Sequence, residues 1–163
     1  MTSVEALKVL LNKYPFTEDL RPEDVQKLLG LAREVSFHKN QVIFREGDEC
    51  DVFYVLTVGS VILEMPVSSC VLGIETLGPG DEFGWSTLLM QHCRHFQARA
   101  RQPVSALAFD GAALIQAFRE DPVFGFGFLW GLLRVVSRRL QATRMRLVDA
   151  YAPRAEEAAA IQS

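Results

Sequence analysis

The segment Arg45-Glu-Gly-Asp-Glu-Cys-Asp-Val-Phe-Tyr-Val-Leu-Thr-Val-Gly59-Ser-Val61 decides the fold of this chain. A polar, glycine-containing stretch leads into an apolar run, and a second apolar run begins just after Gly59. A tight turn between two strands needs a positive φ angle, which glycine adopts without steric cost. We therefore predict two strands joined by a turn at Gly59.

The same pattern extends over residues 35–110. Short apolar segments alternate with turn residues, and glycine recurs between them. The segments are Gln41–Phe44, Val52–Val58, Val61–Met65, Cys70–Leu77, Phe96–Ala100 and Val104–Phe109. Many short strands with glycine turns are typical of a barrel, roll or sandwich.

Helices are predicted before this region, over residues 1–34. Thr2 and Glu5 have the spacing of a capping box, and an apolar stripe follows them. Pro15 should end the first helix, because proline disfavours helix in the residue before it. Pro22 is a favourable first residue for a second helix.

Helices are also predicted after the strands, over residues 111–152. Asp110 suits an N-cap, and Asp121-Pro122 is a stronger start, with an N-cap followed by proline at the first helical position. We expect this long helix to end near Tyr151 and residues 153–163 to form a flexible tail. The Gly127-x-x-x-Gly131 spacing favours close packing, which we expect to be on the strands.

These features predict an α+β protein. Its centre is an antiparallel β-roll of about eight short strands over residues 35–110, flanked by N-terminal helices over 1–34 and by a long C-terminal helix within 111–152. A chain of 163 residues and 18.3 kDa suits one such domain.

Composition excludes several classes of protein. The net charge of −3 gives no basic footprint for nucleic acid. The three cysteines, Cys50, Cys70 and Cys93, are odd in number and widely spaced, so they fit neither a disulfide framework nor a paired zinc motif. The N-terminus lacks the pattern of a signal peptide. The longest apolar run has about 12 residues, against roughly 20 for a membrane span. A cytoplasmic protein outside the membrane is expected.

Four stretches resemble a known family. Residues 45–61 and the motif Leu77-Gly-Pro-Gly-Asp-Glu-Phe-Gly84 are similar to the core of cyclic-nucleotide-binding domains of the catabolite activator (Crp/Fnr) type. Residues 137–143 resemble the family's long C-terminal helix, and residues 16–25 its N-terminal part. The resemblance covers residues 14–150 and implies a β-roll flanked by helices, in agreement with the prediction above.

The resemblance also implies a ligand site, a phosphate-binding cassette over residues 83–96. In the family the cassette begins Phe-Gly-Glu and closes with Arg, then Ser or Thr, then Ala. The arginine binds the cyclic phosphate through two parallel hydrogen bonds, and the glutamate accepts the ribose 2′-hydroxyl. Phe83-Gly84 match this pattern here, Ser86 lies within it, and Arg94 stands at the arginine position.

Three positions depart from the cassette. Trp85 replaces the glutamate, and His95 and Phe96 replace the small residues after the arginine. Tryptophan is a hydrogen-bond donor only, so it cannot accept the ribose hydroxyl. The bulk of Trp85 and Phe96 could also fill the ribose and base volume. We therefore expect that cAMP is not bound in the family's usual mode.

Two further roles are implied for the C-terminal helix. Thr143 matches a threonine that contacts the base, and Arg139 matches a neighbouring polar contact. Arg139 has an alternative reading as part of a solvated face with Arg138, Arg144 and Arg146. The family usually dimerises through this helix, and an apolar seam supports a homodimer. The seam residues are Leu129, Leu132, Val136 and Leu140.

Catalytic and metal sites are not expected. Ser86 and His95 could act as nucleophile and base, but no orienting carboxylate is evident. The segment His92-Cys93-Arg94-His95 offers three possible metal ligands, and no second cluster completes four. We read it as an ordinary loop.

The sequence therefore predicts a non-catalytic regulatory or sensor domain that binds a small anionic ligand or a protein partner. Two alternatives remain open. One is genuine binding of cAMP or cGMP, with Arg94 on the phosphate and Thr143 near the base. The other is an accessory subunit of a redox enzyme complex with a filled pocket. Direct DNA binding is not expected, because relatives use a helix-turn-helix of roughly 60–70 further residues beyond the long helix.

Overall fold

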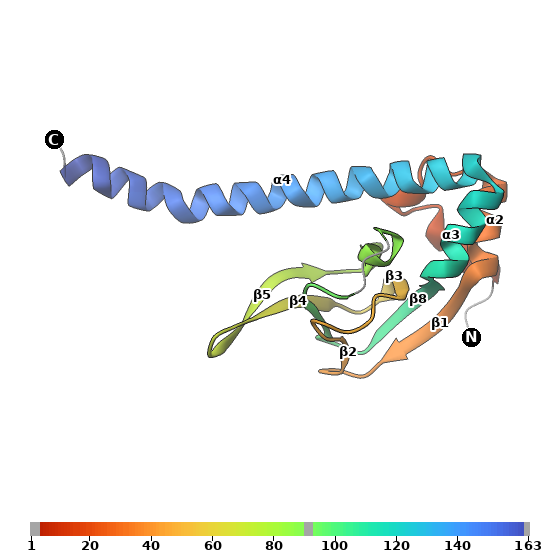
Figure 1. The fold of residues 1–163 in the computed structure, drawn as a ribbon, viewed down its shortest axis with the longest axis horizontal. Coiled ribbons are helices and arrows are strands. Elements are labelled where there is room, and N and C mark those ends of the chain that lie inside the picture. The colour runs from red at the N-terminus through yellow and green to blue at the C-terminus, as the bar shows by residue number, and fades with distance from the viewer. Residues whose placement is uncertain (1–3, 90–92, 162–163) are drawn as a thin grey trace.

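The computed structural model describes residues 4–89 and 93–161, and it forms a β-roll with helices on one side (Figure 1). The helical elements are α1 (Val4–Leu11), the 3-10 helix η1 (Pro15–Thr17), α2 (Pro22–Leu31), the 3-10 helix η2 (Trp85–Leu89), α3 (Gly111–Glu120) and α4 (Pro122–Ile161). The strands are β1 (Ala32–Phe37), β2 (Val42–Phe44), β3 (Val52–Val58), β4 (Val61–Val67), β5 (Cys70–Leu77), β6 (Glu82–Phe83), β7 (Gln97–Ala100) and β8 (Val104–Asp110).

The strands form two antiparallel sheets of four strands each, in the orders β1-β8-β3-β6 and β2-β7-β4-β5. The predicted α+β fold with an antiparallel β-roll is confirmed. The predicted turn at Gly59 is confirmed as well, since its φ angle is +89°. A Cβ at this glycine would lie 3.1 Å from the carbonyl carbon of Pro103 and closer still to its oxygen.

Two strands were not predicted. β1 begins at Ala32, inside the segment that we expected to be helical, and pairs with β8 from Ala32 opposite Phe109 to Phe37 opposite Val104. β6 has only two residues, which pair with Tyr54 and Val55 of β3. Both strands are defined by partners far away in the sequence, which a local pattern does not show.

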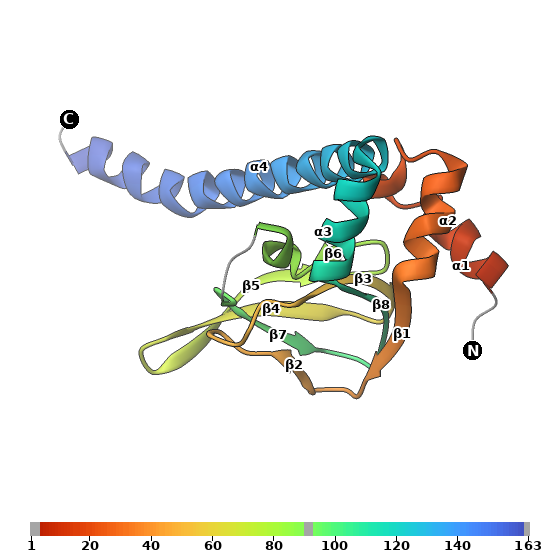
Figure 2. The ribbon, with the colours of Figure 1, turned by 45° about the vertical axis from the view of Figure 1, so that its right-hand side comes forward.

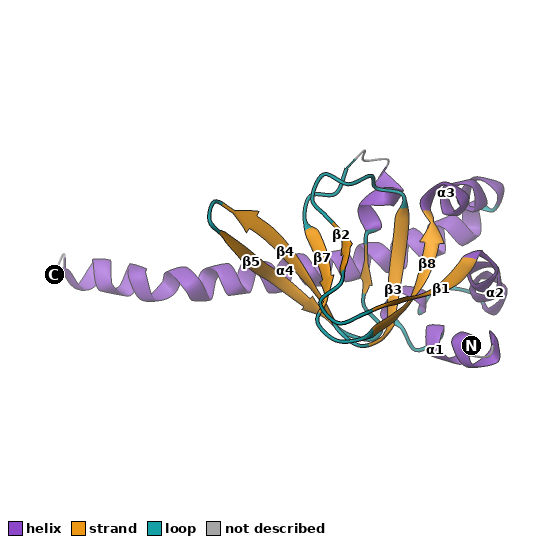
Figure 3. Ribbon diagram, turned by 90° about the horizontal axis from the view of Figure 1, so that it is seen from below, coloured by secondary structure: helices purple, strands orange, loops and turns teal. Residues whose placement is uncertain are grey.

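The long helix α4 continues past Pro153 to Ile161, so its predicted end near Tyr151 is wrong. Proline removes one helical hydrogen bond, but the residues around it are rich in alanine, the best helix former. The distal part of α4 and the β4–β5 hairpin extend from the roll in the same direction (Figures 1 and 3). In the part of the chain that is described, no helix combines the length and the apolar character that crossing a membrane needs.

The proximal part of α4 is fixed to the rest of the domain by aromatic packing. Phe124 and Phe128 are fully buried and contact Phe118 of α3, while Phe128 also contacts Phe16 and Phe53. α3 leads from the end of β8 to the start of α4 (Figure 2). A second apolar cluster, which includes Leu56, Val61 and Phe83, fills the inside of the roll.

The glycines of α4 allow η1 to approach closely. A Cβ at Gly131 would lie 2.8 Å from the carbonyl carbon of Phe16 and closer still to its oxygen, and one at Gly127 would lie 3.2 Å from Leu20. The expectation that these glycines pack on the strands is therefore wrong. Their partner is the N-terminal segment, which the sequence pattern could not identify.

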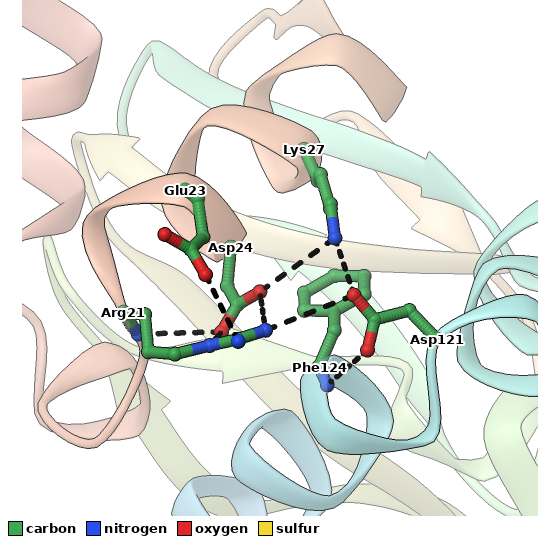
Figure 4. Close-up of polar contacts among 6 residues, drawn as sticks. All are labelled: Arg21, Glu23, Asp24, Lys27, Asp121 and Phe124. Atoms are coloured by element: carbon green, nitrogen blue, oxygen red, sulfur yellow. Dashed lines mark hydrogen bonds and ion pairs between the residues drawn. The ribbon is translucent and has the colours of Figure 1, made fainter.

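A polar network ties α2 to the start of α4 (Figure 4). The guanidinium of Arg21 donates two hydrogen bonds of 2.7 Å to Asp24, and Lys27 pairs with both Asp24 and Asp121. Asp121 accepts a hydrogen bond of 3.1 Å from the backbone N–H of Phe124, which confirms it as the predicted N-cap. The hydrogen bond from Lys27 lowers the pKa of Asp121.

The N-terminal cap expected at Thr2 and Glu5 depends on Thr2, which lies outside the described residues. The second N-cap prediction, at Asp110, is confirmed, because its side chain accepts a hydrogen bond of 2.8 Å from the backbone N–H of Ala113.

Candidate functional site

A pocket of about 270 Å³ lies between the β-roll and α4. Four of the predicted ligand-site residues line it, although they come from distant parts of the chain: Trp85, Phe96, Arg139 and Thr143. The other lining residues are Leu63, Ile74, Glu75, Val136 and Leu140. One wall belongs to the roll and the other to α4, so the pocket spans the junction of two parts of the fold.

Trp85 and Phe96 line this pocket and do not fill it. Trp85 is the first residue of η2 and packs against the apolar cluster that contains Phe124 and Phe128 of α4. Phe96 packs against the apolar cluster inside the roll. The alternative of a filled pocket, on which the accessory-subunit reading depended, does not match this geometry.

Arg94 is not among the described residues that line the pocket. Its side chain is buried, with 3% of its surface exposed, and its guanidinium donates hydrogen bonds to the backbone oxygens of Gly84 (3.1 Å) and Val52 (2.7 Å). The same group sits 4.3 Å from the centre of the Phe44 ring, in cation–π geometry. Arg94 therefore holds the turn around Gly84 together through two of its nitrogens, while its Nε is buried with no hydrogen-bond partner among the described residues.

Phe83 and Gly84, the first two residues of the cassette, also have structural roles. Phe83 is buried in the core of the roll and stacks on Tyr54, with ring centres 4.9 Å apart. Gly84 has a φ angle of +77°, and a Cβ there would meet the backbone oxygen of Val52 at 2.7 Å. Neither residue lines the pocket.

Ser86 and His95 are also not among the described residues that line the pocket. The Ser86 hydroxyl is 2.9 Å from the sulfur of Cys50, and His95 is exposed. His92, part of the loop considered for metal binding, lies outside the described residues. Among residues 4–89 and 93–161, no group of three His, Cys, Asp or Glu side chains is placed to hold a metal ion.

Arg139 reaches from α4 to the roll. It donates a hydrogen bond of 2.7 Å to the backbone oxygen of Glu82. Its guanidinium also lies 3.4 Å from the carboxylate of Glu82, 3.6 Å from that of Asp81 and 3.8 Å from that of Glu75. The arginines proposed to share a solvated face with it, Arg138, Arg144 and Arg146, are exposed. Arg139 is turned inward and links the long helix to the sheet.

Glu82 is a functional candidate that the sequence did not reveal. Its side chain is 1% exposed, and its Oε1 atom has no hydrogen-bond partner among the described residues. Burial raises the pKa of Glu82 to about 7, although Arg139 acts in the opposite direction. Glu82 belongs to the motif of residues 77–84, but only the fold shows that it is buried and lies next to Arg139.

The raised pKa of Glu82 predicts a pH dependence of stability. A carboxyl with a pKa of about 7 in the folded state and 4.5 as its ordinary value binds more protons when folded. The free energy of unfolding should therefore fall as the pH rises from about 4.5 to 7. Glu82→Gln cannot titrate, so its stability relative to wild type should increase over this range. Chemical denaturation of both proteins from pH 4.5 to 8 measures the difference, and parallel pH curves would contradict the assignment.

The family match is consistent with this geometry. A scan against family models matches the cyclic nucleotide-binding domain over residues 34–121, which is more than half of the chain and includes all of the roll except the first two residues of β1. The chain belongs to the cyclic nucleotide-binding domain family.

Regulatory proteins are among the relatives of this domain. It is 26% identical over 133 residues to the CRP-like cAMP-activated global transcriptional regulator of Mycobacterium tuberculosis, covering 81% of this chain and 58% of that protein. It is 27% identical over 110 residues to a cAMP/cGMP-dependent phosphodiesterase of Dictyostelium discoideum, covering 63% of this chain and 10% of that protein. The chain thus spans less than two thirds of either relative.

A solved structure shares the fold of this cyclic nucleotide-binding domain over most of its length. A protein of Geobacter metallireducens, described as cyclic nucleotide-binding, superposes with a TM-score of 0.71 at 29% identity. The superposition covers 86% of this chain and 99% of that chain.

The four residues of the predicted dimer seam do not share one exposed face of the domain. Leu132 is buried, with 7% of its surface exposed, and Val136 packs partly against the same core. Leu129 and Leu140 are exposed. Leu132 therefore packs inside the single chain, and the dimer surface stays a prediction.

Proposed function

We propose that this chain is a non-catalytic regulatory domain, in which the molecule that occupies the pocket sets how α4 lies on the β-roll. We propose further that cAMP is not held there in the family's usual mode. The observation that carries the proposal is the position of Arg94, whose guanidinium is buried against two backbone carbonyls.

Binding of a cyclic phosphate in the usual mode needs a free guanidinium that presents two parallel donors. To reach the pocket, Arg94 would have to leave Gly84 O, Val52 O and the ring of Phe44. Buried carbonyls that lose their donors cost about 1–3 kcal/mol each. Trp85 adds a second obstacle, since it offers no acceptor for a ribose hydroxyl.

The long helix is suited to carry the response. Its proximal end is held by Phe124, Phe128, Gly131 and the network around Asp121, whereas every residue from Gln141 to Ala152 is exposed. The pocket lies where these two parts meet, since its α4 wall includes Val136, Leu140 and Thr143. A ligand that binds one helix position better than another shifts the population toward it.

We also propose that the domain forms a homodimer through α4, or docks a protein partner there. Exposed apolar side chains recur along the helix at Leu133, Leu140 and Leu147, a seven-residue spacing that suits the pairing of two helices. Light scattering coupled to gel filtration should give twice the mass of one chain, and Leu147→Glu should shift it toward the monomer. A monomeric wild type would exclude the homodimer.

Movement of α4 is tested by a distance measurement between spin labels. One label replaces Val58 on β3 and the other Met145 on α4, both exposed, in a variant whose three native cysteines are serine. Compounds that raise the melting temperature should change the mean distance between the two labels or narrow the distribution of distances. If every stabilising compound leaves the distance unchanged, the regulatory role of α4 is wrong.

True cyclic-nucleotide binding is the second candidate. It is favoured by the cAMP-activated relative and by the presence of Arg139 and Thr143 in the pocket. In that case the loop around Arg94 would rearrange to bring the guanidinium to the phosphate, and Arg94→Ala should abolish cAMP binding. Unchanged affinity in Arg94→Ala would reject this candidate.

A further inference from the structure

The walls of the pocket between the roll and α4 indicate the kind of molecule that fits it. Apolar side chains form both sides, with the rings of Trp85 and Phe96 from the roll and Leu140 from the helix. Sites for small organic molecules are typically lined in this way, with a few polar groups that fix orientation. The volume of about 270 Å³ lies just below the usual range of roughly 300–1,000 Å³, so the occupant is small.

The charges around the pocket disfavour an anion. Among the described lining residues, Arg139 carries the single positive charge. Three carboxylates already lie within 3.8 Å of its guanidinium, from Glu75, Asp81 and Glu82. An incoming anion would have to displace one of these carboxylates or face all three. Either outcome weakens the binding of an anion, because one leaves a carboxylate without its partner and the other sets like charges side by side.

A cation is disfavoured by the same arrangement. Glu75, the single carboxylate among the described lining residues, is paired with Arg139 at 3.8 Å. A cationic ligand would therefore meet the guanidinium of Arg139, and the carboxylate that could bind the ligand is already paired with that guanidinium.

We infer that the pocket binds a neutral, largely apolar small molecule, up to about the size of a substituted bicyclic aromatic compound. This inference rests on the proposed function and names the ligand class of the same site. It also replaces the small anion expected from the sequence, because that expectation depended on a free guanidinium at Arg94.

Three probes of nearly equal shape and different charge test the inference. They are 2-naphthalenemethanol (neutral), 2-naphthoate (anionic) and 2-naphthylmethylammonium (cationic), each titrated into the full chain by calorimetry at pH 7.5. The neutral probe should bind at least tenfold more tightly than either charged probe. Equal or tighter binding of a charged probe would overturn the inference, and so would the absence of binding by all three.

A matched pair of variants on β5 tests whether the neutral probe binds in this pocket. Ile74 lines the pocket, whereas Leu72 is exposed on the same strand and is not among the described lining residues. Ile74→Glu should weaken binding of 2-naphthalenemethanol at least tenfold, and Leu72→Glu should leave it unchanged. Thermal unfolding of both variants checks that they fold. Equal affinities in the two variants would place the probe elsewhere and overturn the inference.

The same spin-label pair separates this inference from the proposed function. If 2-naphthalenemethanol binds and the distance between residues 58 and 145 stays the same, the ligand class stands and the regulatory role of α4 fails. If 2-naphthoate binds more tightly and changes that distance, the regulatory role stands and the ligand class fails.

Discussion

Replacing Gly131 with alanine is expected to lower the free energy of unfolding by about 3 kcal/mol, because the new methyl group overpacks a buried contact. The added Cβ would lie 2.8 Å from the carbonyl carbon of Phe16 and nearer to its oxygen. These are backbone atoms, so they cannot turn aside as a flexible side chain would. α4 would have to lift away from η1, and the contact of Phe128 with Phe16 (ring centres 5.6 Å apart) would weaken.

The control is Gly30→Ala in α2, where a Cβ would have no neighbour within 4 Å. Alanine is favoured over glycine within a helix by up to about 1 kcal/mol, so this variant should be as stable as wild type or slightly more stable. For a chain of this size, the loss in Gly131→Ala corresponds to a fall of roughly 6–12 °C in melting temperature. Equal melting temperatures for the two variants would show that η1 and α4 are not packed as described.

Replacing Arg94 with methionine is expected to cost about 2–3 kcal/mol of stability. Methionine keeps much of the apolar stem but removes the donors that satisfy Gly84 O and Val52 O. Each buried carbonyl left without a partner costs about 1–3 kcal/mol, and relief from burying the charge offsets part of this. Urea denaturation measures the loss.

Arg101→Met is the matched control, since Arg101 is exposed and its replacement should change stability by less than about 0.5 kcal/mol. If Arg94→Met were as stable as this control, Arg94 would not be a structural residue. Its guanidinium would then be available to bind a ligand, and the proposed function would lose its main support.

Local sequence signals predicted much of the fold. The turn at Gly59, the start of α2 at Pro22 and the N-caps at Asp110 and Asp121 each depend on the chemistry of a few neighbouring residues. β1 and β6 were missed because their pairing partners are distant in sequence. α4 does not end where Pro153 alone predicts, because the alanine-rich residues around this proline favour helix.

The candidate site was predicted only in part. Similarity to a family identified Trp85, Phe96, Arg139 and Thr143, and the fold brings these four residues around one pocket. Motif spacing places a Cα atom but does not give the direction of its side chain. It therefore could not show that the guanidinium of Arg94 points to backbone carbonyls, or that Glu82 is buried.

The most direct test of the central claim is a melting-temperature titration of the wild-type chain with cAMP and cGMP. A ligand at 100 times its Kd adds about 2.7 kcal/mol of stability, which is roughly 5–10 °C for a chain of this size. We predict no shift at millimolar cyclic nucleotide, because two nitrogens of the Arg94 guanidinium donate to the backbone oxygens of Gly84 and Val52. A rise of 5–10 °C that is lost in Arg94→Ala would contradict the account and make this a cyclic-nucleotide sensor of the usual kind.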